Sequence, residues 1–189
     1  MNGLILVGGQ STRMGIDKSQ LLYHTKPQWQ YLYDLFLPFC QKTFLSCHES
    51  QKENFGNGIV LIDPYTIGPI GGILSAFEQD SNEAWLVVAC DMPFVNEKTI
   101  DFLIQNRNPI QIATAFQNPQ TRLPEPLLTI WEPAAYLFLK EAYAKSQSSP
   151  LRILQNTDLK LLECPHPDWL RNVNTTEEYR ALMKRIDLY

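Results

Sequence analysis

The chain has 189 residues, of which 44% are hydrophobic and 19% are charged, and its formal net charge is −4 at pH 7. This length suits one well-buried domain, which we place at residues 1–189, and it is short for two. The negative balance argues against a non-specific nucleic-acid binder, because such proteins depend on dense lysine and arginine. We therefore expect no nucleic-acid partner.

The cysteines and the apolar segments indicate the compartment. Cys40, Cys47, Cys90 and Cys164 form no CxxC pair and have no regular spacing, which predicts buried thiols in a reducing compartment rather than disulfides or a zinc site. No stretch approaches the roughly 20 apolar residues of a membrane span. The apolar start MNGLILVGG lacks the basic residues of a signal peptide. We expect a cytoplasmic protein without a membrane partner.

The first half of the chain alternates apolar strands with one amphipathic helix. The predicted elements are a strand at 3–7, a helix at 26–40, and strands at Thr43–Cys47 and Ile59–Ile62. The strand at 3–7 is apolar without alternation, as in a parallel sheet covered on both faces. A polar loop, GGQSTRMGIDK, follows this strand.

The middle of the chain contains a helix that begins with proline, Pro69–Gln79. Its pair Gly71-Gly72 would cost about 1 kcal/mol per residue relative to alanine, so we expect another part of the chain to approach closely there. An apolar strand at 84–90 then leads into Asp91. Asn96 is a suitable N-cap for the next predicted helix, Glu97–Gln105.

The second half continues the alternation, and its predicted elements are strands at 109–116 and 126–131, a helix at 133–144, a short helix from Ser149-Pro150, the strand Leu159–Glu163 and a final helix. Thr175 and Glu178 match a capping box at the start of the final helix. Strands that alternate with helices in this way predict a three-layer α/β/α sandwich with a mostly parallel, Rossmann-like sheet.

Polar residues follow several of these strands. The loop at 8–18 follows the first strand, Asp63-Pro64 the third and Asp91-Met92-Pro93 the fourth, and Asn172-Val173-Asn174 precedes the last helix. Ligands of such sheets bind outside the carboxyl ends of the strands. The sequence therefore predicts a site where carboxylates, amides, cations and a glycine-rich turn share one edge.

The loop after the first strand is a candidate phosphate-binding loop. It is not a Walker A motif, because Ile16 follows Gly15, and it is not the Rossmann fingerprint, because Gln10 occupies the second required glycine. Glycines there would let backbone N–H groups approach phosphate oxygens. Arg13 and Lys18 would supply positive charge, although the alternative of a solvated loop stays open.

A carboxylate that faces a polyphosphate can bind a divalent cation. Mg²⁺ prefers one or two carboxylates together with substrate phosphates, so Asp91 becomes a candidate ligand. The alternatives are a turn for Asp91 and for Asp63, and a helix cap for the pair Asn172 and Asn174.

These motifs resemble a known family. LVGGQSTRMGIDKSQLL resembles LAGGxSxRMGxDKxLL, the signature of the MobA-like nucleotidyltransferases, which have the fold of nucleotide-diphospho-sugar transferases. Further matches follow in order: KPQWQ with GKPL, DPYTIGPIGGILSAF with D…GPLAGIL, CDMPF with CDxP, EPLLTIW with PLxALY, and NVNTTEEY with N[IV]NTPEE. The resemblance covers nearly the whole chain.

The resemblance implies roles for individual residues. It implies catalytic roles for Arg13, Lys18 and Asp91, with Asp91 as the Mg²⁺ ligand. It implies nucleotide contacts from Leu6, Val7, Gly8, Gly9, Lys18, Asp63 and Asp91. It implies second-substrate contacts from Gly68, Pro69, Gly72, Asn172 and Asn174.

The activity implied is Mg²⁺-dependent transfer of GMP from GTP to the phosphate of molybdopterin, with release of pyrophosphate and with molybdoenzyme-specific delivery proteins as further partners. The attacking phosphate is already anionic, so no general base is needed, and His24, His48 and His166 lie outside the motifs. We expect these histidines to be structural.

The chain departs from the family pattern at Val7, at Gly71 and at Ser46, where the guanylyltransferases usually carry asparagine. The alternatives are a molybdopterin cytidylyltransferase, another transferase acting on a small phosphate acceptor, and a degenerate nucleotide-binding regulatory protein.

Overall fold

The fold comes from a computed structural model that describes residues 1–8, 17–65 and 67–186. A seven-stranded sheet has the order β3-β2-β1-β4-β6-β5-β7. Its strands are β1 (Asn2–Leu6), β2 (Thr43–Cys47), β3 (Ile59–Ile62), β4 (Trp85–Ala89), β5 (Ala113–Gln117), β6 (Pro124–Trp131) and β7 (Leu159–Glu163). Strand β6 is antiparallel to both of its neighbours, and the other strand pairs are parallel. The prediction of a mostly parallel sheet is confirmed.

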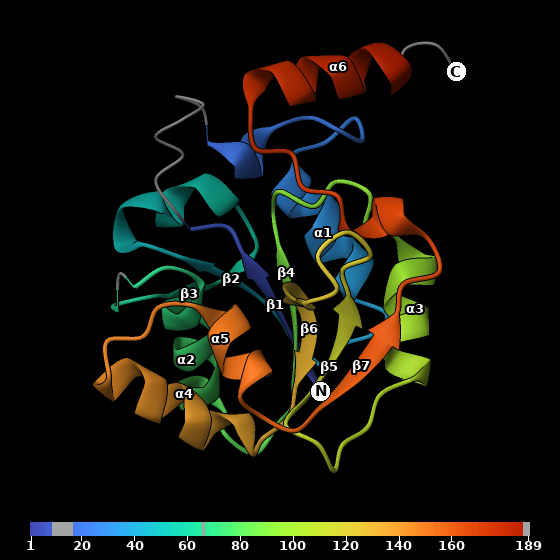
Figure 1. The fold of residues 1–189 in the computed structure, drawn as a ribbon. Helices are drawn as coiled ribbons and strands as arrows, with labels where there is room; N and C mark the ends of the chain where they lie inside the picture. Colours follow the sequence, from blue (N-terminus) through green and yellow to red (C-terminus); the bar gives the residue numbers. More distant parts are fainter. Residues whose placement is uncertain (9–16, 66, 187–189) are drawn as a thin grey trace.

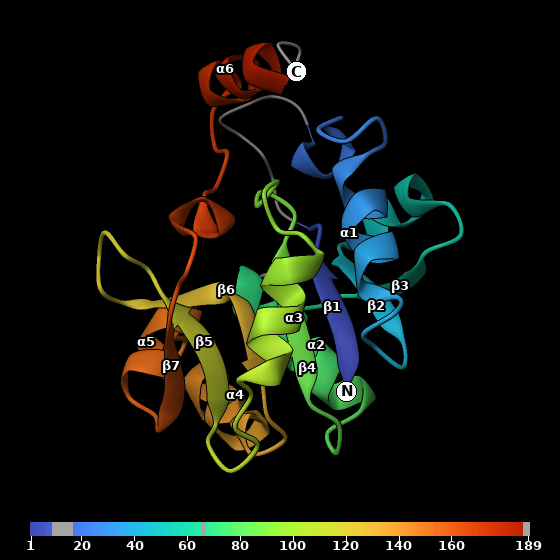
Figure 2. The ribbon, with the colours of Figure 1, turned by 90° about the vertical axis from the view of Figure 1, so that its right-hand side faces the viewer.

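Helices cover both faces of this sheet (Figures 1 and 2). The α-helices are α1 (Gln28–Phe36), α2 (Pro69–Gln79), α3 (Glu97–Gln105), α4 (Ala135–Ala144), α5 (Pro150–Gln155) and α6 (Thr176–Ile186), and the 3₁₀ helices are η1 (Lys18–Gln20), η2 (Glu49–Phe55) and η3 (Pro167–Leu170). Helices α1 and α3 share one face, and α2, α4 and α5 share the other. The predicted three layers are therefore present.

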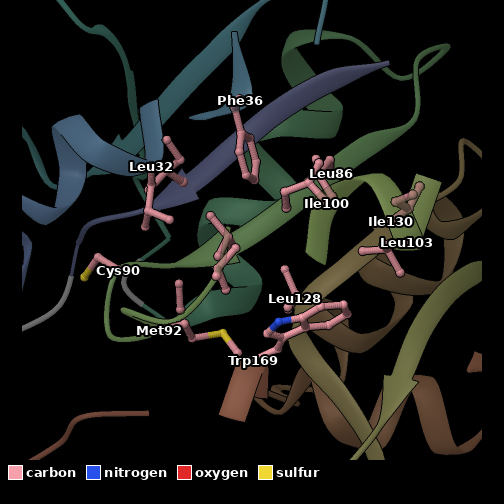
Figure 3. Close-up of a cluster of buried hydrophobic side chains, with 14 of the residues drawn as sticks. Leu32, Phe36, Leu86, Cys90, Met92, Ile100, Leu103, Leu128, Ile130 and Trp169 are labelled. Carbon is pink, nitrogen blue, oxygen red and sulfur yellow. The ribbon is translucent and has the colours of Figure 1, made fainter. Parts of the chain in front are cut away.

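Each face has its own apolar core. On the α1–α3 face, Phe36 and Ile100 are fully buried in the cluster drawn in Figure 3. On the other face, Ile73 of α2 and Leu139 of α4 pack against the same sheet. A third, smaller cluster, which we call the C-terminal cluster (Leu21, Tyr23, Val173 and Leu182), joins α6 to the segment after η1. Helix α6 lies beyond the carboxyl ends of the central strands (Figure 1).

Some predicted boundaries were wrong. The first helix spans Gln28–Phe36 rather than 26–40, because Pro38 lacks the N–H group that a continuing helix needs. Strand β5 begins at Ala113 rather than at residue 109. The segment between β2 and β3 contains η2, which the sequence analysis did not predict. All four cysteines are free; Cys40 is half-buried and the others are buried. No helix within the described part of the chain is long and apolar enough to cross a membrane.

Candidate functional site

A cavity of about 1170 Å³ lies at the carboxyl ends of the parallel strands. Strand β1 lies between β2 and β4. The chain first continues to one side of β1, through β2 and β3, and then crosses to its other side at β4. Such a switch point opens a crevice in an α/β sheet. The cavity is lined by the ends of β1 to β4, by η1 and η2, and by the first turn of α2.

The cavity brings together most of the residues expected from the sequence. These are Leu6, Val7, Gly8, Lys18, Asp63, Gly68, Pro69, Gly72 and Asp91. The residues expected at the second substrate are divided: the three from the α2 segment share the cavity with Asp63, whereas Asn174 joins the site through a contact with Lys18. Arg13 and Gly9 lie outside the described residues, so their roles stay predictions.

Lys18 links two parts of the site. Its ammonium group donates a hydrogen bond to Oδ1 of Asn174 at 2.6 Å and lies 3.4 Å from Oδ2 of Asp91. The preceding Asp17 caps η1, accepting from the N–H of Ser19 at 2.9 Å and from its hydroxyl at 2.7 Å. This cap fixes the backbone from which the lysine side chain extends.

Asp91 is held by its backbone rather than by its carboxylate. Its carbonyl accepts from the N–H of Val173 at 2.8 Å, and the N–H of Cys90 bonds to the carbonyl of Leu6 at 3.2 Å. Oδ1 of Asp91 is buried and has no hydrogen-bond partner among the described residues. Burial raises the pKa of the Asp91 carboxyl, and the nearby Lys18 offsets part of that rise.

A second oxygen close by is in the same state. Oδ1 of Asn172, next to the residue that bonds to Asp91, is also buried without a partner within the described part of the chain. Carboxylate and amide oxygens are the ligands that hard divalent cations prefer, so these two residues fit Mg²⁺. Among the described residues no group of three or more His, Cys, Asp or Glu could hold a metal; a cation here would take its further ligands from water and from substrate phosphates.

The opposite end of the cavity is built around Asp63. Its Oδ1 accepts from the N–H of Tyr65 at 2.8 Å. A Cβ on Gly71 would lie 2.6 and 2.7 Å from the Asp63 carboxylate oxygens, and a Cβ on Gly72 would lie 2.5 Å from Oγ of Ser46. The predicted close approach at the glycine pair is thus confirmed, and it places a carboxylate against the first turn of α2, where the helix dipole favours negative charge.

The backbone at the end of β1 is already engaged. The N–H groups of Val7 and Gly8 both donate to the carbonyl of Ser46, at 3.0 and 2.9 Å. They are therefore not available as phosphate donors. The expected donation from a glycine-rich loop rests on residues 9–16, outside the described residues.

Part of the cavity wall was missed by the sequence analysis. His48, Glu49, Ser50 and Gln51, at the start of η2, line the cavity, and Nε2 of Gln51 lies 3.5 Å from Oδ2 of Asp17. This polar segment follows β2, so the strand-end rule that selected the other loops would have found it.

The sequence of the chain matches a known family and several curated proteins. Residues 3–161 match the family model described as the MobA-like NTP transferase domain. A molybdenum cofactor biosynthesis bifunctional protein of Synechocystis sp. is 33% identical over 180 residues; the match covers 94% of this chain and 52% of that protein, so the chain spans about half its length. A molybdenum cofactor guanylyltransferase of Pseudomonas fluorescens is 26% identical over 184 residues, covering 92% and 89% of the two chains.

A solved structure has the same fold. The crystal structure of molybdopterin-guanine dinucleotide biosynthesis protein A from Archaeoglobus fulgidus aligns with a TM-score of 0.83 and 22% identity, over 100% of both chains. The arrangement of strands and helices is therefore shared along the whole chain.

Proposed function

The chain belongs to the MobA-like NTP transferase domain family, and from this premise we propose that it transfers GMP from GTP to the phosphate of molybdopterin. The names of relatives that align over nearly the whole chain support this activity. The single observation that carries it is the contact of Lys18 with both Asp91 and Asn174 beside a cavity large enough for a nucleotide.

The proposed reaction needs no general base. An anionic oxygen of the acceptor phosphate attacks the α-phosphorus of GTP, and the bond from that phosphorus to the bridging oxygen breaks. Pyrophosphate leaves with the bonding electrons, and a new phosphoanhydride bond joins the two substrates. Catalysis then consists of positioning and charge neutralisation. The ring of His24 contacts the carbonyl of Pro93 instead of the cavity, whereas His48 lines the cavity wall at the start of η2.

Asp91 and Asn172 would hold the Mg²⁺ ion, since both have a buried oxygen without a partner among the described residues. When bound, the ion supplies positive charge against the phosphate oxygens. Lys18 would move from its contacts with Asp91 and Asn174 toward the triphosphate, and Arg13 would add a second cation. These side chains offset charge that develops during the transfer.

The nucleotide would lie between the two ends of the cavity. Asp63 and the residues from Leu6 to Gly9 would contact the base and ribose. Asn172 and Asn174 would contact the second substrate at the Asp91 end. Gly68, Pro69 and Gly72, which the resemblance assigns to the same substrate, lie at the Asp63 end of the cavity. A protein that delivers the product to a molybdoenzyme would be a further partner.

Ser46 bears on which nucleotide base the cavity selects. It lies against Gly72 inside the cavity, at the position where the guanylyltransferases usually carry asparagine. A cytidylyltransferase is therefore the competing activity.

The decisive experiment offers purified protein each of GTP, CTP, ATP and UTP with Mg²⁺ and molybdopterin. Pyrophosphate release and the mass of the dinucleotide are measured, with Asp91→Ala as the inactive control. We expect product with GTP alone. A preference for CTP would identify the competing activity, and tight nucleotide binding without turnover would indicate a regulatory protein.

A further inference from the structure

The turn between β4 and α3 carries Asp91 but has no regular secondary structure. Buried backbone carbonyls need partners, and in this turn side chains supply most of them; the carbonyl of Met92 also accepts from the N–H of Val95 at 3.4 Å. The donors are Nε2 of Gln28 to the carbonyl of Met92 at 3.4 Å, Nε2 of His24 to Pro93 at 2.8 Å, Nδ2 of Asn96 to Phe94 at 3.1 Å, and the hydroxyl of Tyr31 to Val95 at 3.1 Å. Four consecutive carbonyls are thus held by side chains.

Most of these donors come from one short segment of the chain. His24, Gln28 and Tyr31 lie in a tight hairpin and in the helix α1 that follows it. The hairpin is closed by an antiparallel bridge between Leu22 and Pro27, and by a bond of 2.9 Å from the N–H of Gln28 to the carbonyl of Leu21. The rings of His24 and Tyr31 are stacked, with centroids 3.8 Å apart. The three donors therefore come from one compact, hydrogen-bonded segment.

The proton on His24 follows from its partner. A carbonyl can only accept a hydrogen bond, so Nε2 of the imidazole carries the proton. Burial lowers the pKa of His24, which favours the neutral ring near neutral pH. The contact with Pro93 needs only this neutral form.

The same segment begins at the catalytic lysine. Helix η1 starts at Lys18, and the hairpin follows it directly. The segment therefore presents Lys18 at one end and grips the turn after Asp91 at the other. The Asp91 carboxylate has one side-chain contact among the described residues, Lys18 at 3.4 Å. With so few side-chain contacts, its position depends on the backbone of its turn.

We propose that His24, Gln28 and Tyr31 form a polar clamp that fixes the turn after β4 and thereby positions the Asp91 carboxylate beside Lys18 for cation binding and transfer. These are positioning residues, and none of them touches the substrate. The inference rests on the proposed function of Asp91.

Gln28 separates the clamp from ordinary packing. Its side chain is fully buried, and its Oε1 has no partner among the described residues. A buried polar group without a partner is destabilising, and an apolar residue of similar size would pack better there. Its Nε2 instead donates to the carbonyl of Met92 at 3.4 Å, a role that packing alone does not supply.

The test uses Tyr31→Phe and Gln28→Leu, which remove one donor each, and Tyr33→Phe on the same helix as the matched control. The Tyr33 hydroxyl bonds to no other described residue. Outer contacts of metal ligands typically change metal affinity or activity by 10-fold to 100-fold. For both clamp variants we expect kcat to fall by roughly 10-fold and the half-saturating Mg²⁺ concentration to rise by roughly 10-fold, with KM for GTP and the thermal midpoint close to wild type.

Two further measurements require neither acceptor nor turnover. Mn²⁺ binding, followed by electron paramagnetic resonance with the nucleotide that the wild type binds, should weaken in both clamp variants. Amide exchange in the turn after β4 should quicken in both, and Tyr33→Phe should leave both properties unchanged. Because these readouts are independent of transfer, a wild type that makes no dinucleotide would refute the proposed function without deciding the fate of the clamp.

Two outcomes would overturn the clamp. One is Mn²⁺ affinity and turn exchange equal to wild type in both clamp variants. The other is a nucleotide affinity without metal that falls in step with kcat, which would indicate general damage to the cavity. Tyr31→Phe removes a single atom, so the test stands even where Gln28→Leu folds poorly.

Discussion

Two acids of the cavity, Asp63 and Asp91, are held in opposite ways. Asp63 is bonded to the backbone N–H of Tyr65, and the glycine at position 71 lets its carboxylate rest against the first turn of α2. Asp91 has one oxygen without a partner among the described residues and the other 3.4 Å from Lys18. Its pKa is raised, chiefly by burial. Asp63 is therefore bonded by its own loop, whereas Asp91 has a contact with Lys18 on one oxygen and no partner among the described residues on the other.

This difference indicates what each end does. A satisfied carboxylate holds its geometry and can discriminate between ligands by the donors that they present. A buried carboxylate oxygen without a partner, such as Oδ1 of Asp91, destabilises the folded state, and such groups persist where function needs them. Oδ1 of Asp91 could therefore accept a bound cation, whose positive charge would stabilise the carboxylate.

The largest effect is expected from Asp91→Ala, which removes the unsatisfied acid altogether. Loss of a metal's charge stabilisation is worth several kcal/mol, so kcat should fall by about 1000-fold or more, while circular dichroism shows a retained fold. Pyrophosphate release under saturating Mg²⁺ measures this. Full Mg²⁺-dependent activity in the variant would show that Asp91 does not bind the metal.

Lys18→Ala should have the next largest effect. The lysine contacts both Asp91 and Asn174, and loss of one charged transition-state contact should lower kcat by roughly 100-fold. Initial rates measured at saturating GTP separate a lower kcat from weaker GTP binding. Lys26→Ala provides the control, because that lysine pairs with Asp34 on the surface. Equal rates in the two variants would contradict the role of Lys18.

Gly71→Ala disturbs the satisfied end instead. The new methyl group would overlap the Asp63 carboxylate, and overpacking of this kind costs about 1–3 kcal/mol. We expect KM for GTP to rise by roughly 10-fold, with a smaller change in kcat. Gln79→Ala, on the exposed end of the same helix, is the control. A change confined to kcat would place Asp63 away from the nucleotide.

The smallest effect is a pH dependence of stability. The folded-state pKa of Asp91 is raised, so its contribution to stability is present at low pH and is lost as the pH rises through that value. Asp91→Asn should therefore melt a few degrees above the wild type at pH 7, and the difference should shrink toward pH 4. Thermal scans across this range test it, with the exposed Asp101→Asn as a control. If the difference in melting temperature between Asp91→Asn and the wild type grew toward acid pH, the pKa of Asp91 would be lowered in the folded state rather than raised.

The fold was largely predictable because the residues that start helices and the apolar residues of each segment lie where the packed structure requires them. Helix α2 matches its predicted bounds, since Pro69 sets its start and the residues that follow are apolar. Helix α1 was overextended because the apolar spacing continues past Pro38. The antiparallel direction of β6 was not predicted, since a buried strand has the same residue pattern in either direction.

The site was predictable where residues follow strands. Lys18, Asp63 and Asp91 meet at one edge because parallel strands end together. The polar clamp was not predictable, because it depends on tertiary contacts: Gln28 and Tyr31 each bond to a residue 64 positions away, and His24 to one 69 positions away. The expected role of Arg13 is a prediction still to be tested.

The C-terminal cluster has a consequence for how the molecule opens. Leu21 and Tyr23 follow the lysine of the site, and Val173 and Leu182 flank its last asparagine. Because this small cluster is separate from the two large cores, it should unfold locally at a lower free energy than the sheet. Amide protons of the final helix should then exchange before those of the central strands while the rest of the chain stays native.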